Sequence, residues 1–475
     1  MEKIVGREYE IAFMNSIYES DRSEFIAVYG RRRVGKTFLI RNVYNNKISF
    51  HLTGVANASL RMQLANFNLQ ISKTDEAHLY NPAENWLTAF EQLRGYLEKQ
   101  QGRKLVFIDE LPWFDTVRSG FISALEHFWN SWASMRDDVV LIVCGSATSW
   151  MVNKLINNNG GLHNRITRRL KLEPFNLYEC ELYLKEKNIE LNKYQLIQLY
   201  MAIGGIPYYW NEVQRGLSAQ QNIDEMCFSE KGLLQNEFYN LYRSLFKNYQ
   251  QYIVIVKALA TKSKGLSRID IVRITKLPNG GSSTKALEEL EASGFIRRYL
   301  PFGKKKKDSL FQLVDFYSHF YLKFINNTKI REGGNWLNII DTPKFRAWSG
   351  YAYEQICLYH LPQIKQALGI SGVYTEVSSW RSKKSEPGAQ IDLVIDRRDG
   401  IINICEFKFS INPFNVNSKY AKELQNKIGV FKYETSTRKA VHLTMLTTYG
   451  VVKNANSIGL FQSDYNMEIL FDKSR

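Results

Sequence analysis

The chain has 475 residues, 44% of them hydrophobic, and this length predicts about three domains rather than a single core. The net charge of +16 favours a polyanionic partner, and five scattered cysteines, none in a Cys-x-x-Cys pair, predict reduced thiols in a cytoplasmic protein. No segment approaches the roughly 18 uninterrupted apolar residues of a membrane helix, and the first residues do not resemble a signal peptide. We therefore expect no membrane partner.

The most specific motif lies in residues 25–44. The apolar run Phe25–Tyr29 predicts a strand, residues 30–37 spell GRRRVGKT, and a helix is expected over Phe38–Tyr44. A strand, a G-x-x-x-x-G-K-T loop and a helix in this order predict a phosphate-binding loop, in which backbone N–H groups and the lysine bind phosphate and the threonine binds Mg²⁺. We therefore predict that ATP and Mg²⁺ bind at the following residues: Gly30, Arg31, Arg32, Arg33, Val34, Gly35, Lys36 and Thr37.

Two acidic residues follow a strongly apolar segment about 70 residues further on. Four apolar residues precede Asp109 and Glu110, which predicts a central buried strand with both acids at its carboxyl end. Ligands bind at that end of the strands in open α/β sheets. We expect Asp109 to hold Mg²⁺ together with Thr37, and Glu110 to polarise the attacking water, so the protein is predicted to hydrolyse ATP.

Ser146 and Arg165 are two further candidates in this region. Ser146 follows a second buried strand, Val139–Cys144, and is expected to sense the γ-phosphate; a turn-forming serine is the alternative. Arg165 stands at the entry to a fifth strand within residues 164–174. It is expected to act as an arginine finger, within the chain or from a neighbouring copy in a homo-oligomer, and an ordinary surface arginine is the alternative.

A glycine-rich turn makes the resemblance to a known family specific. The pattern is helical from Leu177 and is interrupted by AIGGIP at residues 202–207. Together, VGRE at 5–8, GRRRVGKT, IDELPW at 108–113 and this turn resemble the archaeal-type, AAA-like ATPases of the STAND class. The resemblance implies a parallel-sheet P-loop core over 1–176, a helical lid over 177–245, and Pro207 lying against the nucleotide base. A Gly-Gly break before a new helix is compatible with that role.

Residues 246–326 are expected to form a winged helix-turn-helix. Residues 246–310 alone carry 10 Lys and 4 Arg against 5 acids. Three helices are predicted at Tyr252–Ala260, Ser267–Thr275 and Ser282–Ser293, followed by a two-stranded wing. Lysines at the tip of the wing suit contacts with DNA phosphates, although such modules also bind proteins. The predicted DNA-binding residues are Lys304, Lys305, Lys306 and Lys307.

The remaining chain, residues 345–475, carries a second constellation after a predicted interdomain linker at 327–344. A helix over 349–361 contains Glu354, and a hairpin turning at Asp399-Gly400 joins a strand at 388–395 to one at 401–409. Asp392, Glu406 and Lys408 have even numbers, so the alternation of a strand puts them on one face. Two carboxylates that bind metal and a lysine that orients water suit attack on a phosphodiester, although a surface hairpin with three charges is the alternative.

This pattern resembles the PD-(D/E)xK restriction-endonuclease-like superfamily, and more closely the C-terminal domain of archaeal-type ATPases. The resemblance implies an α/β domain in which Glu354, Asp392 and Glu406 bind Mg²⁺ and act with Lys408. Ala389-Gln390-Ile391 replaces the proline of the motif before the aspartate.

The sequence thus predicts an α/β protein, in which an ATP-hydrolysing switch is coupled to a metal-dependent DNA nuclease used against foreign DNA. One alternative is an ATP-regulated DNA-binding or scaffold protein with an inactive nuclease fold. Another is an ATPase switch whose basic patch binds a protein or a membrane surface.

Overall fold

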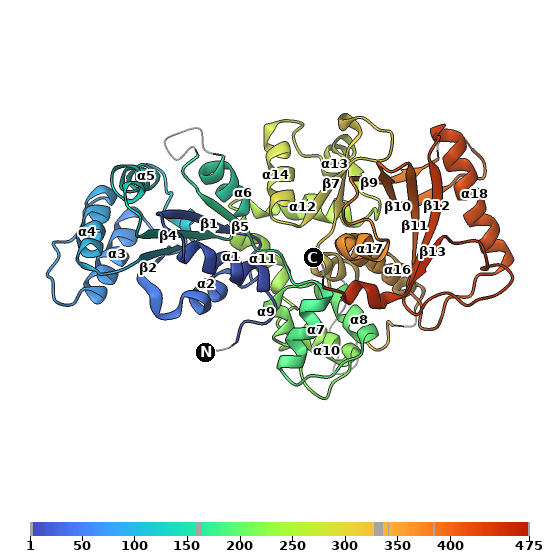
Figure 1. Ribbon diagram of the computed structural model, residues 1–475, viewed down its shortest axis with the longest axis horizontal. Helices are drawn as coiled ribbons and strands as arrows, with labels where there is room; N and C mark the ends of the chain where they lie inside the picture. The colour runs from blue at the N-terminus through green and yellow to red at the C-terminus, as the bar shows by residue number, and fades with distance from the viewer. Residues whose placement is uncertain (1–2, 158–163, 327–335, 341, 383–384, 474–475) are drawn as a thin grey trace. The chain divides into compact units, whose positions relative to one another are not determined.

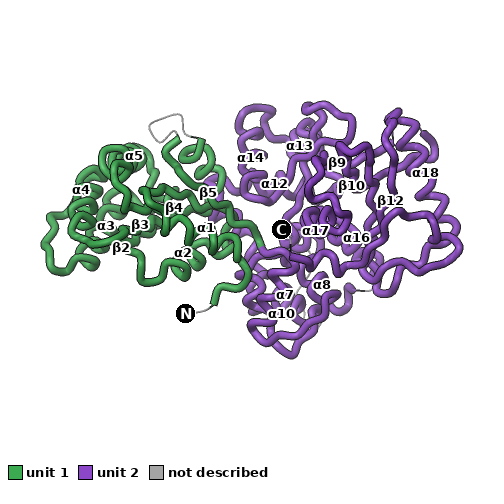
Figure 2. Tube along the Cα trace, in the orientation of Figure 1, with its two compact units in different colours: residues 1–174 green, residues 175–475 purple. Residues whose placement is uncertain are grey.

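The computed structural model describes residues 3–157, 164–326, 336–340, 342–382 and 385–473 (Figure 1). The chain divides into two compact units, residues 1–174 and residues 175–475 (Figure 2).

The first unit is built on a parallel sheet with strand order β2-β3-β4-β1-β5. β3 and β4 are buried along their whole length, as their apolar runs predict. Because every strand is parallel, the carboxyl ends of β1, β3 and β4 meet at one edge of the sheet. The strands are β1 (Glu24–Tyr29), β2 (Ile48–Thr53), β3 (Lys104–Asp109), β4 (Val139–Gly145) and β5 (Arg168–Lys171).

An aromatic core holds helices against this sheet. The Trp86 ring lies edge-on to Phe114 and Phe121, with centroids 5.3 Å and 4.9 Å away. The Ser59 and Asn85 side chains cap α3 and α4, which fixes where these helices begin. The helices are α1 (Glu8–Tyr18), α2 (Lys36–Tyr44), α3 (Leu60–Thr74), α4 (Trp86–Lys99), α5 (Phe121–Ser131) and α6 (Thr148–Trp150), with the short turns η1 (Asn45–Lys47), η2 (Leu111–Trp113), η3 (Ala133–Met135) and η4 (Met151–Ile156).

The second unit begins with a group of helices. The glycine-rich turn between α8 and α9 is tightly packed: Gly204 ends α8 with a φ of 61°, and a Cβ on Gly205 would lie 1.8 Å from the Phe175 carbonyl oxygen. Pro207 is the first residue of α9, the position that tolerates its missing N–H. The helices are α7 (Leu177–Glu186), α8 (Lys193–Ile203), α9 (Pro207–Trp210), α10 (Ala219–Phe228) and α11 (Glu237–Leu245).

Residues 246–326 contain three helices and a small antiparallel sheet of order β6-β8-β7. Ser267 caps α13 by accepting a hydrogen bond from the Asp270 N–H, as predicted. The elements lie close to their predicted positions: α12 (Tyr249–Ala260), β6 (Leu266–Ser267), α13 (Arg268–Thr275), α14 (Gly281–Ala292), β7 (Ile296–Tyr299), η5 (Lys306–Asp308), β8 (Leu310–Leu313), α15 (Phe316–Phe320) and η6 (Tyr321–Ile325).

Part of the predicted linker at 327–344 is packed into an aromatic cluster. Residues 327–335 and 341 lie outside the described residues, but Trp336 is fully buried. Its ring stacks on Phe228 at 5.7 Å and meets Phe320 edge-on at 5.0 Å. Trp336 is therefore a core residue, and the aromatic side chains of Phe320 and Phe324 belong to the same core, as predicted for their helix.

The C-terminal part is a mixed sheet of order β13-β12-β11-β10-β9. β9, β10 and β11 are antiparallel, and β11, β12 and β13 are parallel. α18 covers one face, with Leu424 and Phe431 in contact with Ile402 and Ile404. The elements are α16 (Pro343–Tyr359), α17 (Leu361–Ala367), β9 (Thr375–Arg381), β10 (Gln390–Arg397), β11 (Ile401–Lys408), α18 (Ser418–Thr435), β12 (Ala440–Thr447), β13 (Ser463–Tyr465) and η7 (Met467–Phe471).

Two predictions from composition can be compared with the fold. All five cysteines lie among the described residues, and each is a free, buried thiol. In the described ranges, no helix combines the length and the apolar character that crossing a bilayer requires.

Candidate functional site

The loop between β1 and α2 has the backbone of a phosphate-binding loop. Gly30 has a φ of 142°, and a Cβ there would lie 2.3 Å from the Leu172 carbonyl oxygen. Arg33 and Gly35 also have positive φ values, 72° and 90°, so the chain curls before α2 begins at Lys36. No side chain caps α2, so the amides at its N-terminus are left for an anion. Within the loop, Arg31 and Val34 are buried and Arg32 is exposed.

Lys36 lies at the centre of this site. Its ammonium donates hydrogen bonds to the Gly30 carbonyl (3.0 Å), the Arg31 carbonyl (2.9 Å) and the Ser146 hydroxyl (3.1 Å). Burial lowers the pKa of this ammonium, because the charged form loses its hydration. A buried cation held mainly by carbonyl oxygens is suited to exchange these weak partners for phosphate oxygens.

The two predicted acids lie next to the loop. The Thr37 hydroxyl donates to the Asp109 carboxylate at 2.8 Å, and a hydroxyl beside a carboxylate is the donor set that Mg²⁺ prefers. Glu110, with a φ of 49°, accepts a hydrogen bond from the Ser146 hydroxyl at 3.0 Å. Ser146 therefore links Lys36 to Glu110, which brings together the predicted loop, the two acids and the serine.

The structure does not place the other two candidates in this cluster. Arg165 is exposed before β5. Pro207 lies in the second unit, where the observed packing accounts for the Gly-Gly-x-Pro turn as a helix junction.

The second constellation lies in the C-terminal sheet. Leu393 pairs with Cys405, and one further step in this antiparallel register puts Asp392 opposite Glu406, as the hairpin predicts. Gln390 donates to Asp392 at 2.9 Å. Burial and the nearby Asp392 raise the pKa of Glu354 on α16, so α16 brings its carboxyl close to the hairpin.

Glu406 is engaged by α18, a contact that the motif alone does not predict. The Lys427 ammonium forms an ion pair with the buried Glu406 carboxylate, and the Tyr420 hydroxyl donates to it at 3.4 Å. The Lys408 ammonium lies 5.0 Å from the Tyr420 ring centroid, so Glu406 and Lys408 do share a face. Lys427 stands between Leu424 and Phe431 on the apolar side of α18, and a cation in such a stripe is the sequence signal for this partner.

The three carboxylates do not form a ready metal site. Among the described residues, no three His, Cys, Asp or Glu side chains are arranged to hold a metal ion. Burial raises the pKa of Glu406, and Lys427 opposes this shift. With Lys427 occupying Glu406, the donor set for Mg²⁺ is incomplete, whereas Thr37 and Asp109 in the first unit do fit the ion.

The predicted DNA-binding lysines lie between β7 and β8. Lys305, Lys306 and Lys307 are exposed and Lys304 is half-buried. Helix α14 carries one lysine, Lys285, against three glutamates, so its charge does not favour the DNA backbone.

The parallel sheet, the P-loop and the acids at its carboxyl edge define a P-loop ATPase domain. Residues 4–213 match the family described as an ATPase domain predominantly from Archaea. The chain thus carries an archaeal-type ATPase domain that binds and hydrolyses ATP.

Relatives and solved structures agree with this assignment. An uncharacterised protein of Methanocaldococcus jannaschii is 25% identical over 403 residues, covering 82% of this chain and 83% of that protein. An uncharacterised ATP-binding protein of the same organism is 42% identical over 43 residues, 9% of this chain and 73% of that protein. The Walker-type ATPase of Pyrococcus abyssi has a TM-score of 0.50 at 18% identity, covering 67% of this chain and 96% of that structure, and so shares its fold.

Proposed function

We propose that the ATPase is a switch coupled to a metal-dependent DNA nuclease in residues 345–475. In the ATPase, Lys36 binds the β- and γ-phosphates, Glu110 polarises water, and Ser146 reports the γ-phosphate to Glu110. Mg²⁺ bound by Thr37 and Asp109 would neutralise phosphate charge. Arg165 and Pro207 are proposed to act as the arginine finger and the base contact.

The observation that carries the nuclease proposal is the convergence of charges around β10 and β11. Asp392 interacts electrostatically with both Glu354 and Glu406, which come from a helix and from the neighbouring strand. Buried like charges raise each other's pKa and destabilise the fold, so a domain without a use for them has little reason to keep them. Mg²⁺ would supply charge neutralisation at the phosphodiester, once Glu406 is released from Lys427, and Lys408 would orient the attacking water.

Residues 246–326 are proposed to be a winged helix-turn-helix that contacts DNA through its wing. The supporting observations are the three helices, the β6-β8-β7 sheet and the exposed lysines between β7 and β8. The glutamates of α14 argue that the wing, rather than this helix, meets the DNA backbone. A role against foreign DNA and a homo-oligomeric state stay predictions.

A second candidate is an ATP-regulated DNA-binding protein with an inactive nuclease fold. The ion pair between Lys427 and Glu406 favours it, because an internal ammonium replaces the metal as the partner of the carboxylate.

Cleavage of DNA separates the two candidates. Full-length wild type, Asp392→Ala and Glu406→Ala are incubated with linear and circular DNA, with Mg²⁺ or Mn²⁺ and with or without ATP. The nuclease proposal expects cleavage by wild type only, with unchanged ATP hydrolysis in all three proteins. Absence of cleavage by wild type on every substrate supports the inactive fold, and cleavage that survives both substitutions places the site elsewhere.

A further inference from the structure

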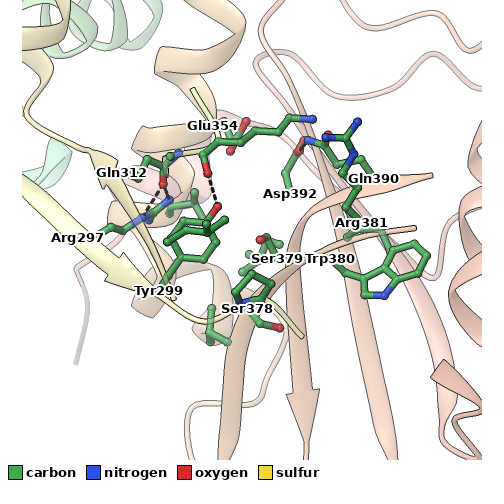
Figure 3. Close-up of a pocket in the computed structure, with 18 of the residues that line it drawn as sticks. Arg297, Tyr299, Gln312, Glu354, Ser378, Ser379, Trp380, Arg381, Gln390 and Asp392 are labelled. Carbon is green, nitrogen blue, oxygen red and sulfur yellow. Dashed lines mark hydrogen bonds between the residues drawn. The ribbon is translucent and has the colours of Figure 1, made fainter. Parts of the chain in front are cut away.

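A cavity of about 380 Å³ lies between the β6-β8-β7 sheet and the strands β9 and β10, within the second unit (Figure 3). Lys264, Arg297 and Tyr299 line it from one side, and Glu354, Arg381 and Asp392 line it from the other. The proposed nuclease carboxylates therefore face residues of the proposed winged helix. Neither part forms this cavity alone.

Directed contacts fix the two walls to each other. The Phe302 N–H donates to the Ser379 carbonyl at 2.8 Å, and the Phe302 ring packs on Phe431 with a centroid distance of 5.2 Å. On the other side, the Tyr351 hydroxyl donates to the Leu313 carbonyl at 3.0 Å. Backbone hydrogen bonds combined with aromatic packing make the small sheet a wall of the cavity.

The charges in the cavity favour an anion next to the carboxylates. Arg297 is held by the side chain of Gln312, at 2.9 Å from its Nε, so this guanidinium is already partnered. In contrast, the exposed side chains of Lys264 and Arg381 form no hydrogen bond or ion pair within the described residues. The Lys264 charge interacts with both Arg381 and Asp392, so two cations without partners lie beside the proposed catalytic acid.

The size and lining of the cavity limit what can enter. Its volume is at the lower end of the range for small-molecule sites, about 300–1,000 Å³. A double helix, whose major groove alone is about 12 Å wide, cannot enter such a space. Tyr299 offers an aromatic ring at the cavity, positioned by a hydrogen bond from its hydroxyl to the Lys264 carbonyl at 2.6 Å.

We propose that this cavity binds one unpaired nucleotide at the end of a DNA strand. Lys264 and Arg381 bind its phosphate beside Asp392, and Tyr299 stacks on its base. The inference deepens the proposed nuclease function and rests on it for the chemistry, because it makes single-stranded ends the substrate. It also explains why the proposed winged helix is joined to the nuclease-like sheet: it supplies part of the binding site.

Linear and circular single strands of the same length and sequence test the proposal. Binding to the full-length protein is measured by fluorescence anisotropy with an internal label in EDTA, so that no strand is cut. We expect the linear strand to bind about tenfold more tightly than the circle, the effect of one charge-assisted contact. Lys264→Gln and Arg381→Gln should each remove this preference, and Lys432→Gln, a control at an exposed lysine of α18, should retain it. Equal binding of the two strands, or an unchanged preference in both variants, overturns the proposal.

A second variant tests whether the small sheet is a wall or a movable cover. Phe302→Ala removes the aromatic anchor, and we expect it to lose the preference for the linear strand. Faster cleavage of duplex DNA by this variant would show that the sheet excludes DNA, which overturns the proposal.

The outcomes also separate this inference from the nuclease proposal. Selective end binding without any cleavage in Mg²⁺ supports the binding site and refutes the nuclease. Equal cleavage of closed circular duplex by wild type and Lys264→Gln supports the nuclease and refutes the end-binding site.

Discussion

Acidification should loosen the second unit through one buried histidine, His360. Its Nε2 accepts a hydrogen bond from the Leu177 N–H at 2.9 Å, and its Nδ1 lies 2.8 Å from the Ile356 carbonyl oxygen. The Leu177 N–H is at the first turn of α7, where a helix provides no internal acceptor. His360 must therefore be neutral to join α7 to α16, because a protonated imidazole has no lone pair for this N–H.

The magnitude follows from the pKa of His360. Burial lowers this pKa from 6.5 to about 4, so between these values the unfolded chain binds a proton that the folded chain excludes. The stabilisation is complete above pH 6.5 and is lost as the pH falls towards 4, to a total of about 3.4 kcal/mol. Of this, about 2 kcal/mol is lost by pH 5. His319, whose burial likewise lowers its pKa to about 4, adds a similar loss.

Comparing variants isolates the contribution of His360. The midpoint of thermal unfolding and hydrogen exchange in the peptide that contains Leu177 are measured from pH 7.5 to pH 5, with exchange corrected for its intrinsic pH dependence. His360→Ala should lower stability at pH 7.5 by about 1–3 kcal/mol, because it leaves a buried N–H without a partner, and should weaken the pH dependence. His127→Ala, at an exposed histidine, is the control. An unchanged pH dependence in His360→Ala would refute the reasoning.

Three further predictions concern the ATPase and the proposed DNA contacts. Lys36→Ala should abolish ATP hydrolysis and weaken nucleotide binding, whereas Glu110→Gln should retain binding and stop turnover; wild-type hydrolysis by Glu110→Gln in a phosphate-release assay would contradict the role of this residue. Gly30→Ala should lower both stability and nucleotide affinity, because its Cβ would lie 2.3 Å from the Leu172 carbonyl oxygen, and a thermal shift equal to that of wild type would argue against this close packing. Replacing Lys304, Lys305, Lys306 and Lys307 with Gln should weaken DNA binding at all sequences and flatten its salt dependence by up to roughly four units of slope, about 0.9 for each phosphate contact; an unchanged slope would place the DNA elsewhere.

The sequence predicts best those features that depend on local patterns. The P-loop, its strand and the acids at Asp109 and Glu110 follow from spacing along the chain, and the hairpin register that puts Asp392 opposite Glu406 follows from its turn. Contacts between distant segments carry no such pattern. The ion pair of Glu406 with Lys427 and the burial of Trp336 depend on how helices pack, so a motif predicted the metal ligand but not the cation already beside it.

The hydrogen bond from Phe302 to Ser379 also protects the C-terminal sheet from self-association. β9 is the last strand of its sheet, and an open edge strand offers unpaired backbone groups to any other strand. The chain between β7 and β8 occupies part of this edge, and its Phe302 ring covers Phe431. A fragment cut at residue 345 would expose both the edge and the apolar surface. The boundary of an independently soluble nuclease-like piece therefore lies before residue 246 rather than at the start of the sheet domain.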